Sequence, residues 1–117
     1  MKSDADPYSP EVRRLFRAPA HAGSLAGARV ARAQGQGVAV ELSMLSDGTR
    51  IEALRFRAYG CPHLLAATEA FCGDFEGRSL SELHAFSAVE ILNRLSVPVE
   101  KTGRILVLED AVRLLGT

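Results

Sequence analysis

The chain has 117 residues, which is enough for one domain with one hydrophobic core. Its 14 Lys and Arg residues balance its 14 Asp and Glu residues, and this zero net charge argues against a nucleic-acid-binding protein, which usually carries a basic excess. No apolar run approaches the ~20 residues needed to cross a bilayer, so no membrane-spanning segment is expected.

The N-terminal sequence MKSDADPYS contains acids and no apolar segment, so it predicts neither a signal peptide nor a transit peptide, and we expect a cytoplasmic protein. Residues 1–7 are polar and expected to be flexible. Ser9-Pro10-Glu11 then predicts the start of a helix, with a capping hydroxyl, a proline in the first turn and an acid near the positive end of the dipole. This helix should end near Arg17, because Pro19 disfavours helical geometry at Ala18.

Three strands are predicted after a loop that reaches Gly27. The sequence ARVARA, residues 28–33, is the first candidate, and residues 34–37 (QGQG) form a flexible turn. From Val38 onward apolar and other residues alternate, so one face of the second strand should be buried. Asp47-Gly48 is a hairpin signal that returns the chain into a third strand from Ile51 to Tyr59. The sheet is therefore expected to be an antiparallel meander of two to three strands.

The third strand should break at Gly60 and continue as a helix that begins at Pro62. The buried stripe of this helix is predicted to contain Leu64, Leu65, Thr68, Phe71, Cys72 and Phe75. Cys61 then lies at the helix N-terminus, where unpaired N–H groups and the dipole favour a thiolate. The alternative is that Cys61 is a small buried apolar residue, as lone cysteines often are.

The second half of the chain is predicted to be helical. Ser79-Leu80-Ser81-Glu82 and Ser87-Ala88-Val89-Glu90 have capping-box spacing and should start helices that run to about Phe86 and Leu95. The second of these should bury Val89, Ile91, Leu92 and Leu95. A last helix is expected from Ile105 to Leu115, opened near Glu109 and Asp110. Strands followed by helices predict an α+β fold with the helices on one face of the sheet, in a single domain covering residues 1–117.

Several short motifs in this order resemble the U-type iron–sulfur cluster assembly scaffolds, the IscU and NifU N-terminal family. The motifs are Tyr8-Ser9-Pro10-Glu11-Val12 with Pro19 and Gly23-Ser24-Leu25, then RFRAYGC at residues 55–61, Thr68-Glu69, GRSLSE at residues 77–82 and Glu109-Asp110-Ala111. The resemblance implies the IscU/SufE-like α+β fold. It also implies that the protein is a scaffold rather than an enzyme. Such a scaffold holds an iron–sulfur cluster or a zinc ion on three cysteines, helped by an aspartate and a histidine. Its partners would be a cysteine desulfurase, which would deliver sulfur as persulfide, or other iron–sulfur assembly proteins.

The chain departs from this family at the implied ligands. Cys61 stands at the second family cysteine, but Gly35 lies about where the first is expected and Gly37 about where the aspartate is expected. Gly103 and Arg104 replace the histidine–cysteine pair near the last helix. An arginine beside a thiol favours an anion, such as a thiolate or a persulfide, rather than a metal cation.

The candidate metal donors are Cys61, His63 two residues later, and His21 from the N-terminal loop. These three are fewer than the four ligands that a tetrahedral site requires. Cys72 is predicted to be a core residue, about 16 Å from Cys61 along the helix. As alternatives to ligation, His63 would be a solvated or capping side chain, and His21 and His84 would lie on the surface.

Three hypotheses follow. The first is a divergent scaffold that works through the single thiol of Cys61, sharing a cluster with a partner or with a second copy of the chain in a homodimer. The second is a SufE-like carrier in which Cys61 accepts and passes on persulfide sulfur. The third is an interaction module that uses no thiol. None of the three involves nucleic acid or a membrane.

Overall fold

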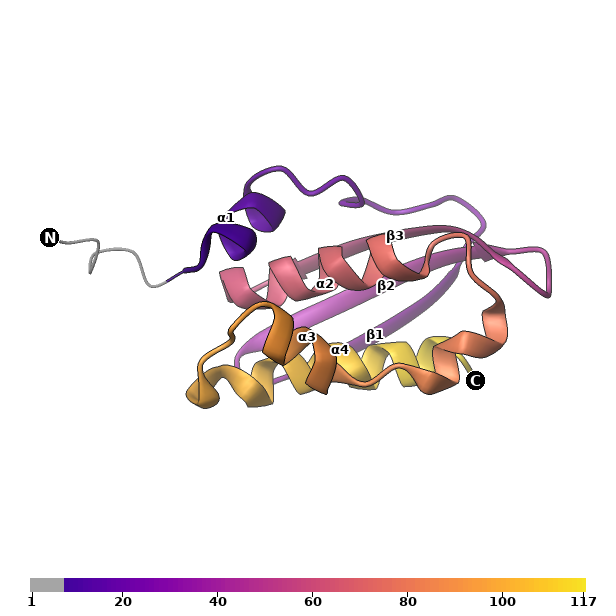
Figure 1. Ribbon diagram of the computed structural model, residues 1–117. Helices are drawn as coiled ribbons and strands as arrows, with labels where there is room; N and C mark the ends of the chain where they lie inside the picture. The colour runs from indigo at the N-terminus through magenta and orange to yellow at the C-terminus, as the bar shows by residue number, and fades with distance from the viewer. Residues whose placement is uncertain (1–7) are drawn as a thin grey trace, which may run out of the picture.

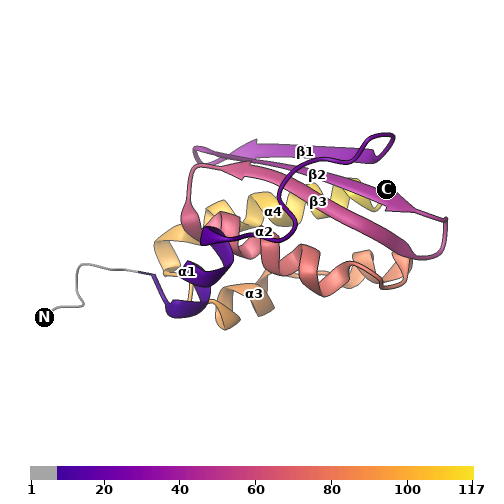
Figure 2. The same ribbon diagram turned by 90° about the horizontal axis from the view of Figure 1, so that it is seen from above.

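Three antiparallel strands form a sheet that carries the helices on one of its faces, as Figures 1 and 2 show. The computed structural model describes residues 8–117. The elements are α1 (Pro10–Arg17), β1 (Arg29–Gly35), β2 (Val38–Ser46), β3 (Ile51–Tyr59), α2 (Pro62–Phe75), the 3₁₀ helix η2 (Leu80–Ala85), α3 (Ala88–Arg94), the 3₁₀ helix η3 (Val99–Lys101) and α4 (Thr102–Leu115). The predicted α+β class is confirmed. The predicted flexibility of residues 1–7 concerns a segment outside the described residues.

The sheet has the order β1-β2-β3, and each neighbouring pair is antiparallel. β1 extends to Gly35, so the first turn is shorter than the predicted segment 34–37 and consists of Gln36 and Gly37, whose φ angles are 54° and 77°. Two residues with positive φ are typical of the tight hairpin turn that matches the twist of its strands. In the second connection, the Asp47 carboxylate accepts backbone N–H groups from Thr49 and Arg50 at 2.9 and 2.8 Å, which confirms the predicted turn.

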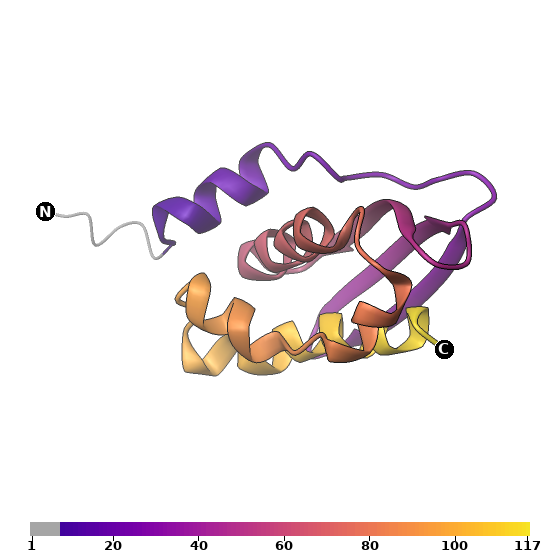
Figure 3. The same ribbon diagram turned by 45° about the vertical axis from the view of Figure 1, so that its right-hand side comes forward.

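The hydrophobic core lies between the sheet and the helices α2 and α4. The predicted inward-facing residues of β2 are all buried, namely Val38, Val40, Leu42 and Met44. In α2 the predicted stripe is too narrow, because Ala66 and Ala67 are also fully buried, while Leu65 is only half-buried. The physical reason is that α2 contacts β3, α1, α3 and α4, so it is enclosed on several sides (Figure 3).

The helical second half follows its prediction only in part. Leu92, predicted to be buried, is half-buried, and Ser87 accepts from the Val89 backbone N–H without the predicted capping box. Ser79 and Glu82 form the expected capping box before η2, and Ile91 and Leu95 are buried in and after α3. Val89 is 60% exposed, because α3 turns the neighbouring Ala88 toward the core instead. α4 begins at Thr102 rather than Ile105, so Glu109 lies in its second half and does not open it.

The segment between α1 and β1 pairs with the outer edge of β3. The backbone N–H of Phe56 donates to the His21 carbonyl at 2.9 Å, and the N–H of Gly23 donates to the Phe56 carbonyl at 2.8 Å. These bonds satisfy part of an otherwise open strand edge. Among residues 8–117, no helix is long and apolar enough to span a membrane.

Candidate functional site

Cys61 lies at the junction between β3 and α2, as the sequence predicts. It is the N-cap residue of α2, with extended backbone angles of φ −163° and ψ 128°, and Pro62 opens the helix. The preceding Gly60 has φ +116°, and a Cβ placed on it would lie 2.7 Å from Val38 Cγ1 and 2.9 Å from the Gly37 carbonyl oxygen. Only glycine allows the chain to turn this closely against the β1–β2 hairpin. Gly60 therefore determines where the thiol is held.

The surroundings of Cys61 favour its ionised form. Burial opposes ionisation and is the largest single influence, since the residue is only 3% exposed. Four groups favour the anionic sulfur: the backbone N–H of Leu64, the Arg104 guanidinium, the backbone N–H of His63 and the positive charge of Lys101. Together these groups hold the pKa of Cys61 below its ordinary value. The direction of this shift is the one expected for a thiol at a helix N-terminus beside Arg104.

The positions that correspond to the other family ligands converge at the same end of the molecule. Gly60 touches Gly37 at the hairpin, and a Cβ on Gly103 would lie 3.3 Å from the side chain of Gln36. Because Gly103 has no side chain, the first turn of α4 can approach the hairpin, and this explains why α4 starts as early as it does. The hairpin, Cys61 and the start of α4 thus form one site, but its glycines offer no metal-binding side chain.

His63 is buried, which corrects the alternative in which it is solvated. Its side chain is 2% exposed, its ring centroid lies 4.9 Å from that of Tyr8, and its Nδ1 has no hydrogen-bond partner among the described residues. Burial, followed by the charges of Lys101 and Arg104, lowers the pKa of His63 against the opposing charge of Glu100. A neutral ring with a free nitrogen is able to bind a metal, but within residues 8–117 no three His, Cys, Asp or Glu side chains gather to hold one. The donor set does not fit a cluster bound by this chain alone.

Cys72 is a core residue, as predicted. It is fully buried, and burial, with the nearby carboxylates of Glu69 and Glu76, raises the pKa of its thiol. A neutral, inaccessible thiol is a poor nucleophile. Of the two cysteines, only Cys61 has surroundings suited to chemistry.

His21 is not a free surface residue, contrary to its prediction, whereas His84 is exposed as predicted. The His21 ring lies between two carboxylates, with Nδ1 2.7 Å from Glu69 Oε2 and Nε2 3.1 Å from Glu76 Oε1. Both ring nitrogens are thus engaged, and His21 does not reach the Cys61 site as a ligand. Arg55 is partly covered and donates to Glu76 at 2.9 Å.

This polar network was missed by sequence reasoning, although Glu69 stands on a helix that is apolar almost throughout, which is a signal of a buried charge with a partner. Glu76 also accepts the Leu54 backbone N–H at 2.9 Å. Burial works against ionisation of this carboxylate, but the Leu54, His21 and Arg55 donors hold the pKa of Glu76 below its ordinary value. The network ties the N-terminal segment to α2 and β3 and so supports the frame around the site.

A family model described as the NifU-like N-terminal domain matches residues 7–114, nearly the whole chain. The chain belongs to this family. The resemblance noted in the sequence is therefore confirmed. A comparison with curated protein sequences gives no match.

Solved structures agree with this NifU-like fold. A candidate iron–sulfur cluster assembly scaffold protein for the SUF system from Fervidobacterium islandicum AW-1 has a TM-score of 0.78 and 18% identity, with 94% of this chain and 96% of that chain covered. A nitrogen-fixing NifU-like protein (N-terminal) from Brucella abortus has a TM-score of 0.67 and 13% identity, with 92% of each chain covered. At these identities the structures establish the fold and leave the role of each NifU-like site residue to the local geometry.

Proposed function

We propose that this NifU-like chain serves in cytoplasmic iron–sulfur cluster assembly and that it does so through the single thiol of Cys61, which accepts sulfur as a persulfide. Membership of the NifU-like family and the description of the Fervidobacterium protein as a cluster assembly scaffold support the first part. The second part rests on the site itself. The proposed partner is a cysteine desulfurase.

The proposal is supported above all by the position of Arg104, whose guanidinium favours the anionic form of the Cys61 sulfur. Where the family has a third cysteine, this chain has a guanidinium that lowers the pKa of the Cys61 thiol. A positive charge next to the sulfur repels a metal cation and stabilises a thiolate or a persulfide anion. With no second cysteine at the site, the geometry supports sulfur carriage better than cluster retention.

The transfer step is a thiolate–persulfide exchange. The Cys61 thiolate attacks the outer sulfur of the donor's persulfide, a new S–S bond forms at Cys61, and the donor's own S–S bond breaks. The electron pair of that bond leaves with the donor sulfur as a thiolate, which takes up a proton. No external oxidant or reductant is needed. Arg104 and the N–H groups at the start of α2 then stabilise the negative terminal sulfur on Cys61.

A second candidate function is supported by His63. Its buried Nδ1 lacks a partner among residues 8–117 and lies two residues from Cys61 in sequence. A partner protein or a second copy of the chain could complete a site begun by Cys61 and His63, with iron or zinc as the bound metal. This would keep a scaffold role with borrowed ligands.

One experiment separates these functions. The protein is purified without oxygen, its iron, zinc and acid-labile sulfide are quantified, and it is then incubated with a cysteine desulfurase and cysteine before intact-protein mass spectrometry. Wild type and the Cys72→Ala control should gain one sulfur atom and contain little metal, whereas Cys61→Ala should gain none. Arg104→Ala should load more slowly than the matched control Arg113→Ala, which removes an arginine farther along α4.

Stoichiometric iron and sulfide in wild type, lost in Cys61→Ala, would reject sulfur carriage in favour of a shared cluster. Equal sulfur loading of wild type and Cys61→Ala would show that Cys61 is not the acceptor. A wild-type protein with neither metal nor sulfur would leave the interaction module as the remaining function.

A further inference from the structure

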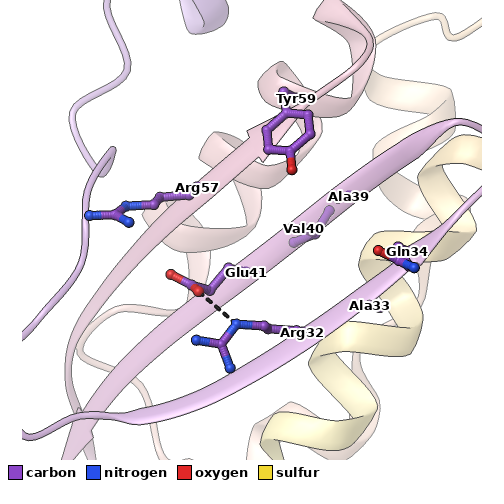
Figure 4. Close-up of a pocket in the computed structure, with 8 residues that line it drawn as sticks. All are labelled: Arg32, Ala33, Gln34, Ala39, Val40, Glu41, Arg57 and Tyr59. Atoms are coloured by element: carbon purple, nitrogen blue, oxygen red, sulfur yellow. Dashed lines mark hydrogen bonds and ion pairs between the residues drawn. The ribbon is translucent and has the colours of Figure 1, made fainter.

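The sheet has a second face, and none of the described helices covers it (Figure 2). The strand register places two rows of side chains across this face, next to the β1–β2 turn and near the end of β3 that leads to Cys61. We call these six residues the outer face; they are Arg32, Glu41 and Arg57 in one row and Gln34, Ala39 and Tyr59 in the next. Together they border an open hollow of about 420 Å³ (Figure 4).

The charges of the outer face are not balanced. Arg32 donates to Glu41 through its Nε at 2.8 Å, which leaves its two terminal nitrogens without a hydrogen bond among the described residues. Arg57 lies on the far side of Glu41 and bonds only the Ser24 hydroxyl at 3.3 Å, so within residues 8–117 it has no carboxylate partner. Two guanidinium groups with free donors are thus held apart on a rigid sheet, with one carboxylate between them.

Tyr59 adds an apolar contact beside these charges. Its side chain is 71% exposed, and Figure 4 shows its ring standing beside the hollow with Arg57 and Glu41 in the neighbouring row. Exposed tyrosine and arginine are the residues that most often anchor protein interfaces, because they combine a large contact area with hydrogen bonding. A tyrosine exposed to this degree contributes little to the stability of the fold, so packing does not explain its place.

We propose that the outer face binds an acidic segment of a partner protein, in which carboxylates pair with Arg57 and Arg32 and an aromatic or aliphatic side chain packs on Tyr59 and Ala39. Guanidinium groups bind carboxylates through two parallel hydrogen bonds, which accounts for the chemistry of the partner. Glu41 in the middle of the row disfavours a continuous polyanion such as a nucleic acid. The proposal goes beyond the persulfide function and does not depend on Cys61.

A second copy of the chain is a poorer occupant of this face. Each copy brings two arginines and one glutamate, and that glutamate is already bonded to Arg32. Two outer faces in contact would therefore oppose four arginines with two glutamates, and the excess positive charge would repel. An acidic segment relieves this excess.

The test is a selection of random peptides displayed on phage against the whole protein, followed by affinity measurements on the enriched peptides. We expect the enriched sequences to combine Asp or Glu with an aromatic residue and to bind more weakly as salt is added. Affinity should fall at least about tenfold in Arg57→Glu and in Tyr59→Ala, since such anchors carry much of an interface's binding energy. Arg113→Glu, the same charge change on an exposed residue of α4, should leave affinity unchanged.

Circular dichroism and urea unfolding verify that each variant folds. If the charge-reversal variant Arg57→Glu does not fold, Arg57→Gln replaces it. Amide chemical shifts perturbed by the peptide should map to β1, β2 and β3. The proposal is overturned if no peptide is enriched, if the enriched peptides lack acids, or if they bind all variants equally. It is also overturned if sedimentation shows a dimer of wild type that Arg57→Glu disrupts, because a second copy would then occupy the face.

Discussion

Replacing Gly60 by alanine should damage both the fold and the site, because this glycine sets the turn before Cys61. The new Cβ would lie 2.7 Å from Val38 Cγ1 and 2.9 Å from the Gly37 carbonyl oxygen, closer than a Cβ normally lies to any non-bonded heavy atom. The second contact is with backbone in a two-residue turn, which has little freedom to move. The φ of +116° is, in addition, a conformation that alanine rarely adopts.

The magnitude follows from these two effects. Holding a non-glycine residue in such a backbone region costs about 1–3 kcal/mol. Forcing an extra methyl group into a packed position costs about 1–3 kcal/mol more. The sum, about 2–6 kcal/mol, is a large part of the roughly 5–15 kcal/mol that stabilises a domain. Gly60→Ala should therefore unfold at a much lower urea concentration than wild type.

The assay is equilibrium urea unfolding, with Gly23→Ala as the matched control. Gly23 has a similar φ of +126°, but a Cβ there would meet nothing within 4 Å, so this variant should show the backbone cost alone. The difference between the two variants then measures the collision with the hairpin. Equal losses of stability in both variants would refute the argument that close packing of Gly60 against Gly37 positions Cys61.

Three further predictions concern the titrating groups. As the pH is raised, the rate at which Cys61 reacts with iodoacetamide should increase, with a midpoint below the ordinary thiol pKa. Arg104→Ala should move this midpoint to higher pH. An unchanged midpoint would exclude Arg104 as the cause of the lowered pKa. Cys72 should react only on unfolding, because its pKa is raised and it is buried; labelling of Cys72 in the native protein, followed by mass spectrometry, would contradict this. Glu76 has a lowered folded-state pKa, so its contribution to stability should be complete above its unfolded pKa and lost as the pH falls through the folded pKa. Glu76→Gln should therefore lose about 1–3 kcal/mol at neutral pH, and its urea unfolding should depend less on pH in the acid range than that of wild type.

The elements of the fold were predictable because their signals are local. Alternating apolar residues from Val38 to Met44, a capping hydroxyl at Ser9 and the glycine–proline pair around Cys61 act over a few residues, and each produced the expected strand, cap or junction. The prediction was wrong where contacts between elements decide which side chains are buried and where a helix begins. Val89 faces solvent because α3 offers a different side to the core, and α4 starts early because Gly103 meets Gln36 across the molecule.

In the candidate site, too, some features follow from local sequence and others only from contacts between distant residues. Residue identity and position were enough to predict that one thiol lies at a helix N-terminus and that the cysteines expected elsewhere are missing. Folding alone brings Arg104 to act on the Cys61 thiol, buries His63 and places His21 between Glu69 and Glu76. These contacts join residues that are far apart in the chain or depend on burial, and no local pattern encodes them. Their electrostatic effect on the thiol arises only when folding brings the charges together and removes the water between them.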